Sequence, residues 1–185
     1  MKKTILSMLF LIAVDQGIKL IIAGSFMDAD AVIIQNFLRF KPVQNTYLSW
    51  INSMRGVTPP VYVMVISNLT AMAVTLICFR YLFFSYAGLG LHKLFTASFP
   101  IVVSGIVCAF IDVVYWGGSI DYICLFNWFT FDLKDCYMTV TMTAVLIIIL
   151  IHTPRWYRLS KEERRRRGFI SWARLGFPVS LPKDF

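Results

Sequence analysis

The chain carries two carboxylates at the rims of apolar runs: Gly105-Ile-Val-Cys-Ala-Phe-Ile-Asp112 closes one run, and Phe131-Asp-Leu-Lys-Asp135 opens the next. A charged group at the edge of a hydrophobic membrane segment is costly, so it usually marks a functional site. Two carboxylates brought to the same rim would form a candidate site for acid and base chemistry on a bound water. We interpret the rest of the chain as the scaffold that brings Asp112 and Asp135 together.

The composition is that of an integral membrane protein. Of the 185 residues, 58% are hydrophobic, and the mean hydropathy is +0.68, whereas soluble domains contain about 45–50% apolar residues. A spanning helix needs about 20 apolar residues, which leaves room for about four spans plus loops and a tail. We expect four transmembrane helices, at about residues 4–24, 61–84, 94–114 and 135–151.

The first apolar run also begins like a secretory signal, because Lys2 and Lys3 precede an apolar core. Asp15 and Lys19 lie inside this run and argue against cleavage, although a cleaved signal ending near Ala23 stays an alternative. Asp15 and Lys19 stand four residues apart and share one helix face. Two interpretations of the pair stay open: an ion pair that holds this helix against its neighbours, or a pair that orients a lipid headgroup or the catalytic site.

The segment between the first two helices has the composition of strands. Residues 31–45 are rich in β-branched and aromatic side chains and alternate partly around Phe37, Arg39 and Lys41, which predicts one or two short strands on the membrane surface. Residues 115–134 are expected to form a loop. The predicted fold is an all-α membrane protein with four transmembrane helices and a small extracytoplasmic β segment between the first two.

The net charge of +8 is concentrated after Thr153. We interpret residues 154–185 as a solvated basic cytoplasmic tail near anionic headgroups, separate from a four-helix transmembrane domain at residues 1–153. No base-reading module accompanies the tail, so no nucleic-acid partner is expected. The distribution of basic residues places both termini in the cytoplasm, and Asp112 and Asp135 then share one depth at the outer interface.

The cysteines do not have the spacing of a zinc site, and the chain has only two histidines. Neither a metal nor a cofactor is therefore expected. Cys124 and Cys136 flank the segment after Asp121, and a disulfide between them stays open.

Five motifs, in order along the chain, resemble those of the bacterial lipoprotein signal peptidases, also called signal peptidase II. They are Asp15-Gln-Gly-Ile-Lys19, similar to D-Q-x-x-K; Asn36 through Asn45 and Trp50, similar to the family's surface β segment; Gly105 through Asp112, similar to G-x-x-G-N-x-x-D-R; Ile120-Asp-Tyr122, similar to V-D-F; and Phe131 through Asp135, similar to F-N-x-A-D.

By this resemblance, Asp112 and Asp135 occupy the places of the family's catalytic aspartates. The resemblance implies a metal-independent aspartic endopeptidase that cuts the signal peptide from a diacylglyceryl-modified prolipoprotein, immediately before the lipidated cysteine. It also implies a multi-pass protein of the bacterial cytoplasmic membrane with its active site at the outer face. We expect Asp135, at a helix start, to be the initial base, and Asp112, in an apolar turn, to be the acid.

Further residues are expected to bind or support the substrate. Asn45 would bind the substrate backbone, and Asp15 and Lys19 would support its lipid end. Asp121 would order its loop. Trp50 is also counted among the supporting residues, because its indole suits the headgroup region of the membrane. We expect a monomer whose partners are the lipid-modified precursor and the phospholipid bilayer.

The chain departs from the family's motifs around both aspartates. Cys108, Ala109 and Val113 stand where the family has Gly, Asn and Arg, and Asp132 and Lys134 stand where it has Asn and Ala. These departures motivate an alternative function: a non-catalytic relative that binds lipoproteins or lipids, or a membrane subunit of an assembly.

Overall fold

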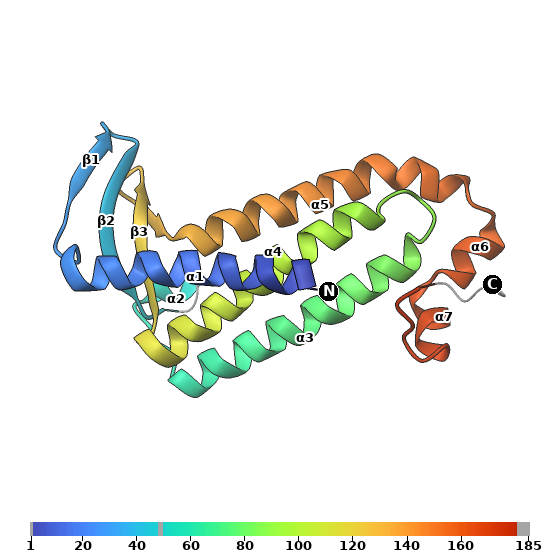
Figure 1. Ribbon diagram of the computed structural model, residues 1–185, viewed down its shortest axis with the longest axis horizontal. Helices are drawn as coiled ribbons and strands as arrows, with labels where there is room; N and C mark the ends of the chain where they lie inside the picture. Colours follow the sequence, from blue (N-terminus) through green and yellow to red (C-terminus); the bar gives the residue numbers. More distant parts are fainter. Residues whose placement is uncertain (1, 48–49, 181–185) are drawn as a thin grey trace.

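The computed structural model describes residues 2–47 and 50–180. Four long helices run side by side, with a small sheet at one end of the bundle and two short helices at the other (Figure 1). A further short helix, α2 (Trp50–Arg55), lies beside the sheet.

The four predicted spans are confirmed. All four helices are long and apolar enough to cross a membrane, and they are α1 (Lys2–Ser25), α3 (Val61–Ser85), α4 (His92–Ile111) with its continuation η1 (Asp112–Trp116), and α5 (Leu133–Arg158). Half of the most apolar window of α4 is buried, compared with 17%, 11% and 6% in α1, α3 and α5. Helix α4 is therefore the central element, and the others expose apolar surface of the kind that lipid covers.

The helices pack around α4 through apolar side chains and one close approach. A buried cluster joins α3, α4 and α5, and its members are Phe79, Leu91, Phe95, Val102, Ile106 and Val145. A Cβ atom at Gly105 would lie 2.1 Å from Met138 Sδ, so the Met138 side chain of α5 fills the space that a larger residue on α4 would occupy. This approach brings the end of α4 to the start of α5.

The sheet is antiparallel throughout, with the order β1-β2-β3-β4. Strands β1 (Ala31–Ile34) and β2 (Leu38–Asn45) confirm the predicted β segment. The prediction of a loop at residues 115–134 was wrong, because this segment contains β3 (Ser119–Leu125) and β4 (Phe129–Phe131). Strand β3 pairs with β2 across a long sequence separation, which a local residue pattern does not reveal.

Two glycines turn the chain from α4 into the sheet. Asp112 begins the π-helical segment η1, and Gly117 and Gly118 follow with φ angles of 70° and 159°. A Cβ atom at Gly118 would lie 2.6 Å from the carbonyl oxygen of Asn45, so the turn needs glycine there. The register then pairs Asn45 with Ser119, and the turn brings β2, β3 and the end of α4 together.

The end of α5 differs from the sequence prediction. The helix does not stop before Pro154 but continues to Arg158. A proline removes a single backbone donor, and the surrounding turns keep their bonds, so a long membrane helix tolerates it. Helices α6 (Lys161–Arg166) and α7 (Phe169–Arg174) follow.

The tail is folded onto the bundle, unlike the solvated segment that the sequence suggested. The Trp172 side chain is 1% exposed, and its ring centroid lies 5.3 Å from that of Tyr81 on α3. Arg167 Nη1 donates hydrogen bonds to the carbonyl oxygens of Ser85 at 3.2 Å and Ala87 at 2.6 Å. Helices α6 and α7 therefore form a cap, residues 161–174, on the end of the bundle opposite the sheet (Figure 1).

Candidate functional site

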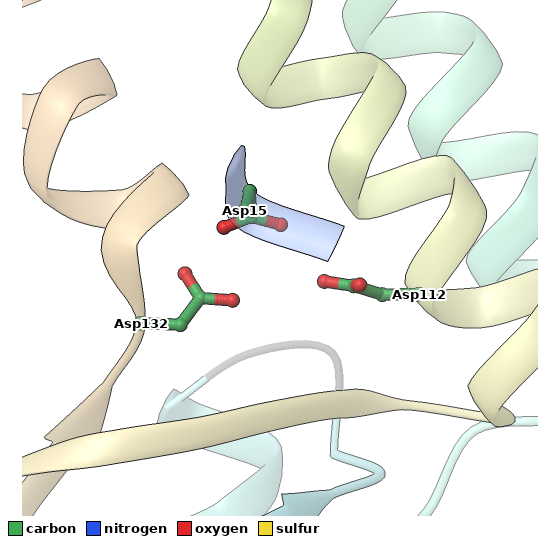
Figure 2. Close-up of side chains that lie close together, drawn as sticks. All are labelled: Asp15, Asp112 and Asp132. Carbon is green, nitrogen blue, oxygen red and sulfur yellow. The ribbon is translucent and has the colours of Figure 1, made fainter. Parts of the chain in front are cut away.

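Five charged side chains are buried together where α1, the end of α4, β3 and the start of α5 meet. Three are aspartates whose carboxylates point toward one another (Figure 2), with one oxygen from each within 4.8 Å of the others: Asp15, Asp112 and Asp132. The other two are Lys19 and Lys134, and none of the five residues is more than 5% exposed. Such a group is stable only if its charges are paired.

Lys19 lies at the centre of this cluster. Its Nζ atom is 3.0 Å from Asp15 Oδ2, 2.6 Å from Asp112 Oδ2 and 2.6 Å from Asp132 Oδ2. The predicted pair on one face of α1 is thus present, and Lys19 extends it to two other elements. The interpretation as an ion pair that holds this helix is confirmed, because the same ammonium group joins α1 to α4 and to the start of α5. The interpretation as a pair that orients a headgroup or the catalytic site stays a prediction.

Lys134 supplies the second positive charge. Its Nζ atom contacts Asp132 Oδ2, lies 3.0 Å from Asp112 Oδ2 and donates to Ser119 Oγ at 2.8 Å. Asp112 Oδ2 therefore lies within 3.0 Å of two ammonium groups, and the Ser119 hydroxyl lies 3.2 Å from the same oxygen. The lysines provide the positive charge that three close carboxylates require.

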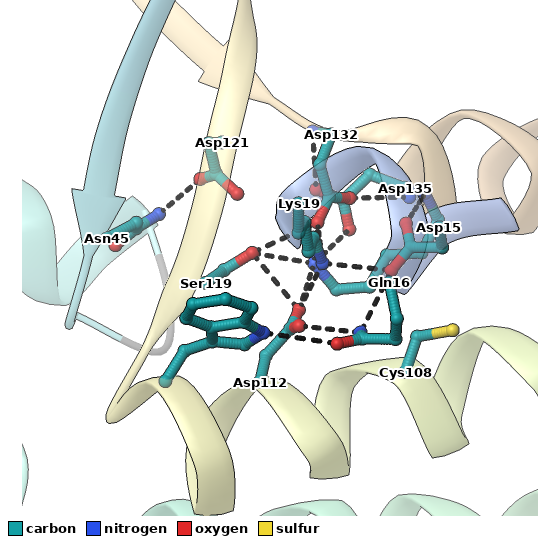
Figure 3. A network of polar contacts seen from close by, with 12 residues as sticks. Asp15, Gln16, Lys19, Asn45, Cys108, Asp112, Ser119, Asp121, Asp132 and Asp135 are labelled. Carbon is teal, nitrogen blue, oxygen red and sulfur yellow. Dashed lines mark hydrogen bonds and ion pairs between the residues drawn. The ribbon is translucent and has the colours of Figure 1, made fainter. Parts of the chain in front are cut away.

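Gln16 holds the other oxygen of Asp112. Its Nε2 atom donates to Asp112 Oδ1 at 3.0 Å and to Asp15 Oδ2 at 3.1 Å, while its Oε1 atom accepts from Trp116 Nε1 at 3.1 Å. Because the indole is only a donor, this bond fixes which way the amide points. Both oxygens of Asp112 are therefore held as acceptors (Figure 3).

Asp135 is held by the local structure at the start of α5. Asp132 is the N-cap, and its Oδ1 atom accepts from the backbone N–H of Asp135 at 3.1 Å. In return, Asp135 Oδ2 accepts from the backbone N–H of Asp132 at 3.5 Å. This capping box uses a second aspartate in the place where Glu or Gln is usual. The Asp135 side chain remains 45% exposed, unlike that of Asp112.

Asp121 forms a second group of carboxylates with Asp132 and Asp135, again with one oxygen from each within 4.8 Å. Asp121 is 3% exposed, and its Oδ2 atom accepts from Asn45 Nδ2 at 2.8 Å. Its buried Oδ1 atom has no hydrogen-bond partner among the described residues. Burial raises the pKa of the Asp121 carboxyl, although the hydrogen bond from Asn45 acts in the opposite direction.

Asp132 belongs to both groups of carboxylates, and its pKa shifts in the direction opposite to that of Asp121. Burial alone would raise the pKa of Asp132, but the ammonium groups of Lys134 and Lys19 outweigh burial and hold this pKa below its ordinary value. Asp132 is thus an ionised neighbour of both Asp112 and Asp135.

Two adjoining cavities open on these residues. The smaller has a volume of about 210 Å³ and is lined by both Asp112 and Asp135. The larger has a volume of about 830 Å³ and lies between the sheet, α2 and the start of α5. Asn45, Asp121 and Asp135 line both cavities, so they mark the junction between them.

The comparison with models of protein families finds signal peptidase (SPase) II over residues 7–152, well over half of the chain. The chain belongs to the signal peptidase II family. Membership of this family, together with four apolar helices, supports a lipoprotein signal peptidase that crosses the bacterial inner membrane several times. The family also implies a lipoprotein substrate and a membrane environment.

Two solved structures share the fold of this signal peptidase II relative. Both are described as bacterial membrane enzyme structures obtained by the in meso method, one at 2.3 Å and one at 1.9 Å resolution. The first has a TM-score of 0.67 and 19% identity, covering 87% of this chain and 94% of that chain. The second has a TM-score of 0.62 and 20% identity, covering 81% and 94%. A search of curated proteins found no match.

Four of the expected supporting residues of the signal peptidase II motifs lie in or beside the charged network: Asp15, Lys19, Asn45 and Asp121. The side chain of Trp50 lies outside the part of the chain that the structure describes. All four cysteines are free, so the bridge left open between two of them is absent.

Sequence reasoning missed the roles of three residues. Gln16 stood inside a motif, but which residues it would contact depends on how α1 is rotated. Asp132 and Lys134 are departures from the family motif whose contacts depend on side-chain orientation, although an acidic residue before a helix start is a recognisable capping signal. Their contacts with Asp112 and Lys19 come from distant parts of the chain.

Proposed function

We propose that this protein is a membrane-embedded aspartic endopeptidase that removes the signal peptide of diacylglyceryl-modified prolipoproteins before the lipidated cysteine. The observation that carries the proposal is that Asp112 and Asp135 line one cavity. Membership of the signal peptidase II family supports the substrate class. The protein would act as a monomer, with both termini in the cytoplasm and this cavity at the outer face of the membrane.

The contacts favour Asp112 as the base and Asp135 as the acid, the opposite of the expectation from the sequence. The sequence showed that Asp135 starts a helix, but it did not show that two ammonium groups contact Asp112. An oxygen so surrounded by donors is an acceptor. Asp135 is more exposed and lies beside two other carboxylates, which suits a group that carries a proton.

These roles give a balanced hydrolysis. Asp112 accepts a proton from a water in the smaller cavity as the water oxygen attacks the scissile carbonyl carbon. Asp135 gives its proton to the carbonyl oxygen, which produces a neutral tetrahedral diol. Asp112 then delivers its proton to the departing amide nitrogen, the C–N bond breaks, and Asp135 recovers its proton from the diol.

The larger cavity is suited to the peptide around the cleavage site. Its wall combines the end of β2 with apolar and aromatic side chains that include Val43, Tyr47, Phe131 and Val140. Asn45 stands at the junction with the smaller cavity and would bind the substrate backbone. Trp50 would join it from α2, and Asp15 and Lys19 would support the lipid end through the network behind Asp112.

The departures at Asp132 and Lys134 support a retained activity. Relative to the family's Asn and Ala, they add one negative and one positive charge, and their side chains contact each other. A change that leaves the local charge balanced is expected where the site is still in use. A protein that had lost its function would not need Lys134 to balance the charge that Asp132 adds.

A non-catalytic relative is the second candidate. It is favoured by the replacements at Ala109 and Val113, which line the smaller cavity, and by the full set of partners on both oxygens of Asp112. Such a protein would bind lipidated precursors without cutting them, or serve as a membrane subunit of an assembly.

Cleavage of a lipidated precursor by the purified protein in proteoliposomes tests the two candidates. We expect product ending immediately before the modified cysteine, and about 10²–10⁴-fold lower rates for Asp112→Asn and Asp135→Asn. Asp28→Asn, which changes an exposed aspartate, is the control. Undiminished cleavage by either active-site variant would refute the residue assignment. Stable binding of the precursor with no cleavage would support the second candidate.

A further inference from the structure

The cap of residues 161–174 divides its basic side chains into two sets. In the first set, Arg164 Nη1 donates to the carbonyl oxygens of Tyr157 at 2.6 Å and Leu159 at 2.9 Å, at the end of α5. Arg167 binds carbonyl oxygens at the end of α3 in the same way. Helix ends leave carbonyl groups without helical partners, so these two arginines fasten the cap to the bundle.

The second set faces a cavity. Lys161 and Arg165 stand four residues apart and share one face of α6, and both are exposed. Neither has a carboxylate oxygen within 4.0 Å in the part of the chain that the structure describes. With Arg166, Glu162 and Ser171 they line a cavity of about 510 Å³. Because Glu162 pairs with Arg166, the charge left to attract an anion there is that of Lys161 and Arg165.

Helix α7 contributes Ser171 to this cavity and also exposes apolar side chains. Phe169 and Ile170 are 57% and 69% exposed, and Phe177, just after the helix, is 47% exposed. Exposed aromatic and aliphatic side chains beside basic ones are typical of a segment that lies in the membrane interface. The surface thus has a basic part and an apolar part next to each other.

The contacts of the cap place α7 beside the last turns of α3. Trp172 packs on Tyr81, and Arg80 Nε donates to the carbonyl oxygen of Phe177, whereas α3 continues to Ser85 (Figure 1). The 25 residues of α3 give a length of about 37 Å, compared with about 30 Å for the hydrocarbon core. The last turns of α3, and α7 with them, therefore lie at the boundary between acyl chains and headgroups.

We propose that residues 161–179 form an interfacial anchor that binds an anionic phospholipid of the cytoplasmic leaflet. Lys161 and Arg165 bind the lipid phosphate in the cavity of the cap, and Phe169 and Ile170 enter the boundary of the acyl chains. The inference does not depend on peptidase activity, and it uses the proposed topology only to name the leaflet.

A phospholipid suits both parts of this surface. It carries a phosphate and acyl chains in one molecule, as the anchor carries basic and apolar groups side by side. An anionic leaflet attracts each basic side chain near it, and apolar burial in the interface adds to this attraction. The cavity alone would accept any phosphate, but a phosphate without acyl chains would leave Phe169 and Ile170 in water.

Native mass spectrometry of the full-length protein in detergent tests the basic part. We expect phosphatidylglycerol to bind in preference to phosphatidylcholine, and Lys161→Gln/Arg165→Gln to weaken phosphatidylglycerol binding about tenfold. Lys2→Gln/Lys3→Gln is the matched control, because it removes two exposed charges on α1, and it should retain this binding. Equal losses in the two double variants would show attraction by total charge alone and would overturn the proposal.

Hydrogen–deuterium exchange in nanodiscs tests the apolar part. The backbone amides of α6 and α7 should exchange about tenfold more slowly in nanodiscs of equal parts phosphatidylcholine and phosphatidylglycerol than in phosphatidylcholine alone, because a ligand of the folded cap suppresses its opening. Ile170→Ser should lose this protection and still bind phosphatidylglycerol in detergent. Unchanged exchange in the two kinds of nanodisc would refute the anchor.

Two other occupants of the surface give different results. If soluble glycerol 1-phosphate alone slows exchange in the cap as much as the anionic bilayer does, the site binds free phosphates and the anchor is refuted. If exchange is slow without anionic lipid and native mass spectrometry finds a dimer, a second copy of the chain covers the apolar side chains, which also overturns the proposal.

Cleavage of a lipidated precursor in neutral detergent separates this inference from the proposed function. We expect Lys161→Gln/Arg165→Gln to cut at the normal rate, because the cap lies at the end of the bundle opposite the sheet. If no form of the protein cuts but the double variant loses phosphatidylglycerol binding, the peptidase assignment fails and the anchor stands. If cleavage occurs but lipid binding does not respond to the double variant, the anchor fails and the peptidase assignment stands.

Discussion

The two ends of the helix bundle use charged residues in opposite ways. Near the sheet, three aspartates and two lysines are buried and contact one another directly. At the other end, the cap of residues 161–174 keeps most of its arginine side chains at the surface, and its best-buried side chain is an aromatic one, Trp172. Removing one member of a buried charged group is expensive, whereas an exposed ion pair contributes little.

This difference indicates that the two ends of the bundle have separate roles. The buried group fixes the position and protonation of particular carboxyls, so each member depends on the others. In the cap, Arg167 binds carbonyl oxygens at the end of α3, while the exposed arginines suit attraction to anionic headgroups on the cytoplasmic side. We therefore propose that the transmembrane domain and the basic cytoplasmic segment, predicted at residues 1–153 and 154–185, meet within the last turns of α5, which continues to Arg158.

Removal of Lys19 should have the largest effect on stability. The Lys19→Ala variant leaves three close carboxylates with a single ammonium group, and we expect a loss of about 3–5 kcal/mol in the free energy of unfolding. Unfolding of the purified protein in a mild detergent measures it. Lys3→Ala removes an exposed lysine from the same helix as a control and should change stability by less than about 0.5 kcal/mol. Equal effects of the two variants would mean that the buried lysine is not needed for charge balance.

The Asp132 and Lys134 replacements should show strong coupling. Lys134→Ala alone leaves Asp132 and Asp112 with one ammonium group between them and should destabilise the protein by about 3 kcal/mol. Adding Asp132→Asn restores the residues of the family motif and should recover about 1–3 kcal/mol of that loss. Unfolding of the parent, both single variants and the double variant gives the coupling energy. Additive effects of the two changes would contradict the idea that they compensate each other.

The sequence predicted the parts of this arrangement that depend on nearby residues. Apolar runs of sufficient length gave the four spans, and the rims of two runs gave Asp112 and Asp135. Strand β3 was missed because its partner β2 lies far away along the chain. The contacts of Lys134 were missed for the same reason, since they join the start of α5 to the end of α4. Burial of Trp172 against Tyr81 depends on how the chain returns to α3 after α5.

The smallest effect should come from the exposed ion pair on α6. Glu162 and Arg166 stand one helical turn apart, with 3.0 Å between Oε1 and Nη2, and their side chains are 75% and 51% exposed. Water already solvates both groups well, so Glu162→Gln should cost less than about 1 kcal/mol, and added salt should weaken even this contribution. Unfolding at low and high ionic strength measures it. A loss as large as that of Lys19→Ala would mean that exposure does not determine how much a charged side chain contributes to the free energy of unfolding. The difference between the two ends of the bundle would then need another cause.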